Sequence, residues 1–137
     1  MNRLKIEKVL PASYKAMLSL SHLTKATSLT LIQIELIKIR ASQINGCSFC
    51  LDMHINYAKK VGESEHRIQQ LPFWRESELF SKEEKLILSL TEEVTLISND
   101  LKDETYYDAA RVLNEVKIAE VIMTTVVINA WNRINKI

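Results

Sequence analysis

The sequence has very few of the residues that form tight turns. It contains two glycines and two prolines in 137 residues, whereas average usage is roughly 7% for glycine and 5% for proline. A chain with so little turn-forming material is poorly suited to hairpins and sheets, while 47% of its residues are hydrophobic and can build a core. We therefore expect an all-α fold, a single-domain bundle of about six helices that spans residues 1–137.

The sequence also lacks a large net charge, a dense set of cysteines and a long apolar run. Its net charge of +1 gives no sign of a nucleic-acid partner. Its two cysteines do not make the framework of a secreted disulfide-rich domain. The first residues lack the apolar core of a signal peptide. The run 121–131 is too short for a bilayer and is broken by threonines and Asn129. These absences favour a cytoplasmic protein without a membrane partner.

The spacing of the apolar residues divides the chain into helical segments. Pro11 can open the first helix, after an irregular arm, and Thr27 or Ser28 can cap the second. Ser81 begins a capping box with Glu84. The second helix is apolar almost all round, so it should be buried on most sides. The expected helices run over about residues 11–23, 28–45, 48–61, 65–71, 82–97, 102–113 and 117–134.

Residues 44–54 hold both cysteines and one of the three histidines. Gly46 can take the left-handed conformation that ends a helix, and a second helical pattern begins near Cys47. Unpaired N–H groups and the dipole of a helix N-terminus favour a thiolate, so a thiol placed there has a lowered pKa. Cys50 follows three residues later, so the two sulfurs can share a face and form a disulfide. His54 lies one turn beyond Cys50, where an imidazole can exchange a proton with a thiol near neutral pH.

Glu35 lies in the preceding helical segment at a depth that matches His54. If the two helices fold back on each other at Gly46, Glu35 is 11 residues before the turn and His54 is 8 after it. At about 1.5 Å per residue, both lie roughly 12–16 Å from the turn. A carboxylate that faces His54 would fix its tautomer and raise its basicity. The alternative is an ordinary salt bridge from Glu35 to Lys38 or Arg40.

The four residues Glu35, Cys47, Cys50 and His54 form a recognisable pattern. The pattern is a glutamate, eleven intervening residues, Cys-x-x-Cys, three intervening residues and a histidine. It resembles the pattern of the alkylhydroperoxidase D-like family, which belongs with the carboxymuconolactone decarboxylase-like proteins. The resemblance covers about residues 10–135. The flanking segments 35–47 and 129–134 are also similar to the family.

The resemblance implies an all-helical homo-oligomer, a trimer or hexamer, that reduces hydroperoxides and serves in antioxidant defence. By this resemblance Cys50 is the thiol that peroxide oxidises to a sulfenic acid, and Cys47 resolves it to a disulfide. His54 and Glu35 relay protons. The implied partners are a small-molecule hydroperoxide and a dithiol or thiol-protein reductant, with no cofactor and no metal.

Two features depart from the best-characterised members of this family. They have a histidine between the cysteines, where this chain has Phe49; the change removes one proton donor and makes the pocket more apolar. They also contain two similar helical halves, whereas this chain has one. A second copy would then come from another subunit, which agrees with helices too apolar for a small exposed bundle.

Other interpretations of the same residues stay open at this stage. The cysteines can be two small buried hydrophobic residues, although their Cys-x-x-Cys spacing argues against this. Cys47, Cys50, His54 and Glu35 can also supply four ligands to a structural zinc ion in a non-enzymatic assembly module. A third interpretation is a protein that senses small electrophiles without turnover. Spacing excludes c-type haem attachment, because its histidine directly follows the second cysteine.

Overall fold

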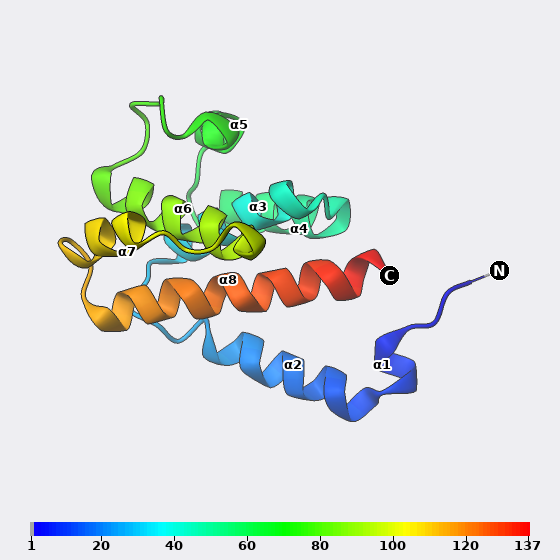
Figure 1. Cartoon of the computed structure of the whole chain (residues 1–137). Helices are drawn as coiled ribbons and strands as arrows, with labels where there is room; N and C mark the ends of the chain where they lie inside the picture. Colours follow the sequence, from blue (N-terminus) through cyan, green and yellow to red (C-terminus); the bar gives the residue numbers. More distant parts are fainter. Residues whose placement is uncertain (1) are drawn as a thin grey trace.

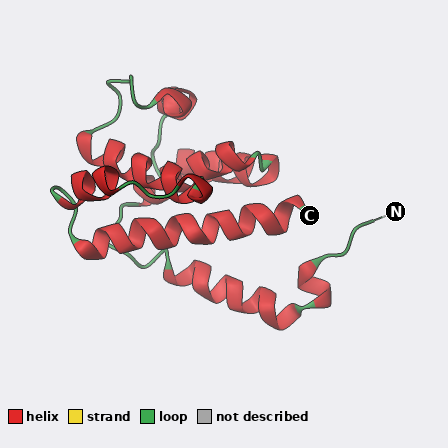
Figure 2. Ribbon diagram, in the orientation of Figure 1, coloured by secondary structure: helices red, strands yellow, loops and turns green. Residues whose placement is uncertain are grey.

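The computed structural model describes residues 2–137, and this part of the chain consists of helices and loops without a strand (Figures 1 and 2). The all-α expectation is therefore confirmed. Residues 2–137 form eight α-helices, against about six expected; the helix that the expected segments do not contain is α1, a single turn where an irregular arm was expected. The helices are α1 Ile6–Val9, α2 Pro11–Leu23, α3 Leu31–Asn45, α4 Ser48–Lys60, α5 Glu65–Gln70, α6 Lys82–Thr95, α7 Asp103–Ala110 and α8 Glu115–Lys136, with 3-10 turns at Leu71–Phe73 and Ile97–Asn99.

Helix α3 is the centre of the fold and packs against α4, α6 and α8. Its apolar residues point in two directions, and each set enters a different cluster of the core. Ile34 and Ile37 pack with residues of α6, α7 and α8. Leu36 and Ile39 pack with residues of α4, α5 and the loops that follow it. The prediction that this helix is buried on most sides is confirmed, and its burial positions the polar residues it carries.

The ends of α3 are determined by local hydrogen bonds. Thr30 is the N-cap, and its hydroxyl accepts from the Gln33 backbone N–H while the Gln33 side chain accepts from the Thr30 N–H. The expectation of a cap at Thr27 or Ser28 is wrong, because Ser28 donates instead to the Glu120 carboxylate on α8. At the other end, Gly46 takes the predicted left-handed conformation, with φ of 66°. The chain can then turn directly into α4.

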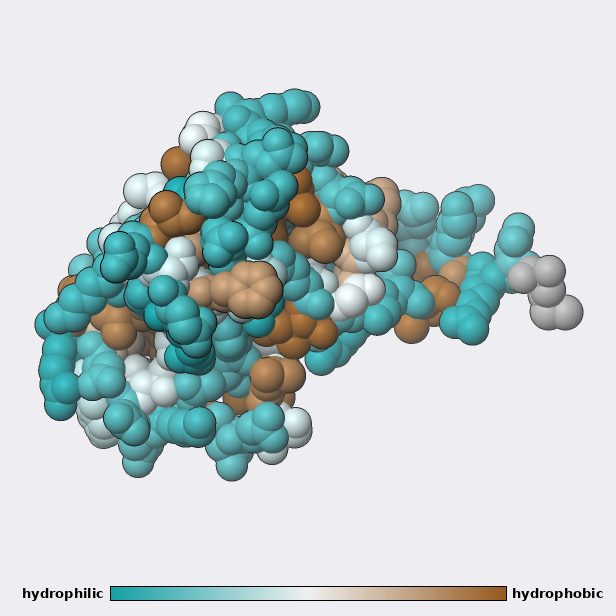
Figure 3. Space-filling view, turned by 90° about the horizontal axis from the view of Figure 1, so that it is seen from above, coloured by the Kyte–Doolittle hydropathy of each residue, from teal (hydrophilic) through white to brown (hydrophobic). Residues whose placement is uncertain are grey.

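Helix α2 lies beside α8 and is the least covered of the long helices (Figure 1). It contains no buried residue, and Tyr14 meets Trp131 of α8 edge to face at 5.3 Å between ring centroids. Figure 3 shows that apolar side chains on the face viewed gather in separate patches among polar ones, while the N-terminal segment projects from the body. None of the helices within residues 2–137 is both long and apolar enough to cross a membrane.

Candidate active site

The two cysteines lie at the junction of α3 and α4 and are joined by a disulfide. Their Cα atoms are 5.3 Å apart, and both residues are almost fully buried. Cys47 is the N-cap of α4, and its sulfur accepts a hydrogen bond from the Cys50 backbone N–H at 3.4 Å. The turn at Gly46 therefore places a sulfur at the N-terminus of a helix, as the sequence predicts. A thiolate formed there on reduction would be stabilised by the same N–H group.

Glu35 and His54 meet across the interface of α3 and α4. His54 Nδ1 lies 2.9 Å from Glu35 Oε2, and the Glu35 residue is only 3% exposed. An ionised carboxylate is an acceptor only, so the proton of this bond belongs to Nδ1. The other ring nitrogen, Nε2, is then left to accept or donate a proton elsewhere. The structure thus brings together the two side chains that the depth argument placed opposite each other.

Lys38 is the second partner of Glu35 and lies one turn along α3. Its ammonium is 3.9 Å from Glu35 Oε1, beyond hydrogen-bonding distance, and its side chain is 6% exposed. Burial lowers the pKa of Lys38; the Glu35 carboxylate raises it in part, and the positive charge of Lys25 lowers it further. The two interpretations of Glu35 are therefore compatible, because one carboxylate oxygen faces His54 and the other faces Lys38.

A pocket of about 320 Å³ lies between α2, α3, α4 and α8. Cys50, His54 and Lys38 reach it, whereas Cys47 and Glu35 do not. Its apolar walls include Tyr14, Leu18, Phe49, Met53, Val127 and Trp131. Of the two sulfurs, Cys50 is therefore the one that faces a space where a small molecule can bind.

Helix α8 contributes polar groups that sequence reasoning missed. Asn135 Nδ2 lies 3.7 Å from Cys50 Sγ and can donate to it. Asn45, at the end of α3, donates to Asn129 and Asn132 at 2.9 Å each, and Lys136 donates to the Asn45 carbonyl at 2.7 Å. These bonds hold the α3–α4 junction against α8. The only sequence signal was the similarity of segment 129–134 to the family.

The donor set for a metal ion is incomplete. Both sulfurs are used in the disulfide, and nowhere in residues 2–137 do three or more histidine, cysteine, aspartate or glutamate side chains group so that they could hold a metal ion. A structural zinc site needs four such ligands, most often thiolates and imidazoles. The zinc interpretation of Glu35, Cys47, Cys50 and His54 is therefore not favoured by this arrangement.

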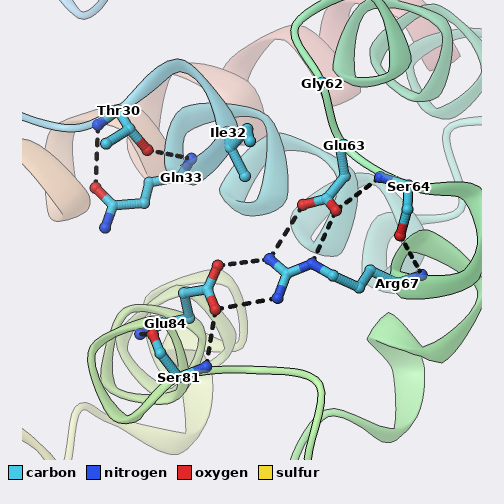
Figure 4. Close-up of a pocket in the computed structure, with 9 residues that line it drawn as sticks. All are labelled: Thr30, Ile32, Gln33, Gly62, Glu63, Ser64, Arg67, Ser81 and Glu84. Carbon is cyan, nitrogen blue, oxygen red and sulfur yellow. Dashed lines mark hydrogen bonds and ion pairs between the residues drawn. The ribbon is translucent and has the colours of Figure 1, made fainter.

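A second, larger pocket of about 500 Å³ surrounds Arg67 on α5 (Figure 4). Arg67 Nε lies 2.8 Å from Glu63 Oε1, and Nη2 lies 2.5 Å from Glu84 Oε2. The guanidinium also donates to the Leu79 carbonyl. The hydrogen bond from Arg67 to Glu84, more than the opposing effect of burial, raises the pKa of Arg67. Burial opposes ionisation of Glu84, but the bonds from Arg67 and Ser81 leave its pKa below the ordinary value.

The helical fold and the arrangement of Glu35, Cys47, Cys50 and His54 define an alkylhydroperoxidase D-like protein. The model of the carboxymuconolactone decarboxylase family matches residues 11–93, which is more than half of the chain. The chain therefore belongs to this family, and the resemblance stated from the sequence is confirmed.

Two individual proteins are similar over nearly the whole chain. The uncharacterized protein YdfG of Bacillus subtilis strain 168 is 40% identical over 134 residues, which cover 97% of this chain and 91% of YdfG. The crystal structure of ATU0492 of Agrobacterium tumefaciens superposes with a TM-score of 0.92 at 32% identity, covering 98% of this chain and 92% of that one. ATU0492 is described as a protein of unknown function and a candidate AhpD antioxidant defence protein.

Proposed function

We propose that the protein is a thiol-dependent peroxidase that reduces organic hydroperoxides in antioxidant defence. The observation that carries this proposal is the Cys47–Cys50 disulfide next to the His54–Glu35 pair, with Cys50 facing the pocket. Membership of the family and the likeness to ATU0492 support the same class of activity. In this proposal Cys50 is the peroxidatic thiol, Cys47 is the resolving thiol, and His54 with Glu35 forms the proton relay.

The first step is attack by the Cys50 thiolate on the terminal oxygen of the hydroperoxide. An S–O bond forms and the O–O bond breaks, so that Cys50 becomes a sulfenic acid and the alkoxide leaves. His54 accepts the thiol proton beforehand and returns it to the alkoxide, which departs as an alcohol. Glu35 stabilises the imidazolium that forms between these two transfers.

The second step closes the disulfide. The sulfur of Cys47 attacks the sulfur of Cys50, an S–S bond forms, and hydroxide leaves as water with the Cys47 proton. An external dithiol then reduces the disulfide by exchange through a mixed disulfide. The balance is one hydroperoxide and one dithiol consumed, with one alcohol, one water and one external disulfide produced.

Intact mass of the reduced protein after one equivalent of cumene hydroperoxide tests this sequence. The wild type should lose about 2 Da as the disulfide forms, and Cys47→Ser should gain about 16 Da as a trapped sulfenic acid. Cys50→Ser should do neither and should not consume peroxide with dithiothreitol. Full peroxide consumption by Cys50→Ser would overturn the mechanism. Stoichiometric oxidation without repeated turnover would instead favour a sensor.

The proposal includes a homo-oligomer, a trimer or hexamer. It is supported by large apolar side chains that are exposed on α2 and α4 outside the pocket of Cys50: Leu23 is 69% exposed and Tyr57 45%. Light scattering of size-separated protein measures the subunit number. A monomer mass at every concentration would contradict this part of the proposal and leave the thiol chemistry in place.

A further inference from the structure

Lys38 is a buried cation whose ammonium makes no hydrogen bond within residues 2–137. Its ammonium carries three donors, yet the carboxylate oxygen it pairs with, Glu35 Oε1, is 3.9 Å away. The other oxygen of that carboxylate is bonded to His54. A charge taken out of water normally has a close partner, because burial without one costs several kcal/mol. The Lys38 side chain instead reaches the pocket that Cys50 faces.

The pocket carries a second positive charge and no negative one. Lys25, an exposed residue in the loop after α2, lines it together with Lys38, and the two are close enough for Lys25 to lower the pKa of Lys38. No aspartate or glutamate of the described chain is among the lining residues. Two lysines that line one small space, with no acid among the other lining residues, favour an anion there.

The rest of the pocket is suited to hydrocarbon. Leu18 comes from α2, Phe49 and Met53 from α4, and Trp131 from α8. Phe49 and Met53 are 63% and 47% exposed, so they lie where a ligand would cover them. The volume of about 320 Å³ is at the small end of the roughly 300–1,000 Å³ of ligand pockets. A chain of moderate length fits this space better than a whole lipid.

We propose that the pocket binds a carboxylate-bearing aliphatic chain, with the carboxylate between Lys38 and Lys25 and the chain against Leu18, Phe49 and Met53. If the protein is the peroxidase proposed above, on which this step rests, its substrate is a short- or medium-chain hydroperoxy carboxylic acid. The product is the corresponding hydroxy acid, and the redox balance is the one given above. The lowered pKa of Lys38 agrees with the assignment, because a bound carboxylate would relieve the cost of its buried charge.

Calorimetric titration of the disulfide form tests the site without any turnover. Octanoate and 1-octanol have the same chain and differ in charge. We expect wild type to bind octanoate at least about tenfold more tightly than octanol, which is the effect of one hydrogen bond to a charged group. Lys38→Met should reduce this preference to less than about threefold, whereas Lys38→Arg should keep it. Lys60→Met, an exposed lysine outside the pocket, should behave as wild type.

Equal affinity of the wild type for octanoate and octanol, or an undiminished preference in Lys38→Met, would overturn the inference. Turnover then separates it from the proposed function. A medium-chain hydroperoxy acid should be reduced at least about tenfold more efficiently than its methyl ester, and the ratio should fall in Lys38→Met. If the protein binds octanoate through Lys38 but consumes neither peroxide, the peroxidase proposal fails and the carboxylate site stands.

Discussion

Lys38 and Arg67 are two cations with little solvent exposure, at 6% and 23% of their side chains, and their surroundings differ in one respect. Arg67 is held by Glu63, Glu84 and the Leu79 carbonyl, with charged hydrogen bonds as short as 2.5 Å. Lys38 is more deeply buried and faces Glu35 at 3.9 Å without a hydrogen bond. Arg67 joins α5 to α6 and has no donor directed at a free space. Lys38 has donors that nothing in residues 2–137 uses, and this is what distinguishes a binding group from a structural one.

The two pockets show the same contrast. The one around Arg67 is larger, about 500 Å³ against 320 Å³, yet the charged groups that line it are bonded to one another (Figure 4). The smaller one holds a sulfur, an imidazole and an ammonium that are available to a ligand. Volume alone would not select the pocket at Cys50, and the unused polar groups of its lining are the reason for which we propose it as the binding site.

The largest expected difference between the pocket of Cys50 and the Arg67 cluster is in peroxidase activity. We expect His54→Ala to lower kcat/KM for a hydroperoxide by about 100-fold, the low end for loss of a general acid–base group. Arg67 touches neither sulfur and does not line the pocket of Cys50, so Arg67→Met should keep activity within about threefold of wild type per folded molecule. Steady-state peroxide consumption with dithiothreitol measures both. Equal losses in the two variants would show that Arg67 supports the catalytic geometry and would remove the contrast.

Thermodynamic stability should depend on the Arg67 cluster more than on the pocket of Cys50, the reverse of the order expected for activity. Arg67→Met leaves the buried carboxylate of Glu63 and the partly buried carboxylate of Glu84 without their partner. We expect it to lower the free energy of unfolding by roughly 3 kcal/mol, the low end for breaking a buried ion pair. Arg111→Met is the matched control, because Arg111 is 76% exposed and its pair with Asp108 should contribute less than about 1 kcal/mol.

Urea denaturation at one fixed protein concentration measures both arginine variants, since any association would otherwise change the apparent stability. Losses of similar size for Arg67→Met and Arg111→Met would contradict the view that Arg67 is the structural cation.

The pairing of Glu35 with His54 shows how much of the site the sequence predicts. Two helices joined by a turn at Gly46 run back along each other, so residues at similar distances from the turn meet; His54 Nδ1 lies 2.9 Å from Glu35 Oε2. Local rules and one glycine are enough to predict this pair. The apolar surface of α3 likewise predicted its central position, because no other place in a bundle buries a helix on most sides.

What the sequence could not predict depends on contacts between distant segments. Asn135 reaches Cys50 across 85 residues, and this contact follows from how α8 packs on the α3–α4 junction. Thr27 or Ser28 is the expected cap of α3, but the Ser28 hydroxyl donates to Glu120 on α8. Local sequence rules cannot predict a bond between residues so far apart in the chain. Lys38 is the intermediate case: its i,i+3 spacing from Glu35 placed it near the site, and only the packing of α2 showed that it faces a pocket.

Acid should weaken the contribution of Glu84 to the free energy of unfolding, and this effect is smaller than that of Arg67→Met. The pKa of Glu84 in the folded protein is below its ordinary value of 4.5, so the stabilisation by its charge is complete above 4.5 and is lost as the pH falls through the folded pKa. We expect Glu84→Gln to cost roughly 1.5 kcal/mol at neutral pH, as for one hydrogen bond to a charged group. The cost should shrink in acid.

Urea denaturation at neutral pH and near pH 4 measures this change. Glu83→Gln is the control, since Glu83 is more exposed and bonds Lys117 on α8; its effect should be smaller. A Glu84→Gln cost that stays constant, or grows, on acidification would show that Glu84 acts through packing and not through its charge.

Replacing Lys38 should have the smallest effect on stability and the opposite sign to that of Arg67. The folded pKa of Lys38 is lowered, so its buried charge costs stability below that pKa, and the cost is relieved as the pH rises through it. Lys38→Met removes a buried charge that makes no hydrogen bond and keeps the bulk. Glu35 retains its bond to His54 at 2.9 Å, so the change leaves no carboxylate without a hydrogen-bond partner. We expect no loss, or a gain of about 1 kcal/mol at neutral pH, that shrinks toward the lysine's ordinary pKa of 10.5.

The same residue change, a cation to methionine, is then destabilising at position 67 and neutral or stabilising at position 38. Urea denaturation of the disulfide form at neutral and alkaline pH measures both. A loss of more than about 1 kcal/mol in Lys38→Met would mean that its 3.9 Å approach to Glu35 holds α3 together. Lys38 would then be a structural cation like Arg67. With no loss, the fold does not need this charge, and the proposed role in binding explains why a lysine occupies a buried place in the pocket that Cys50 lines.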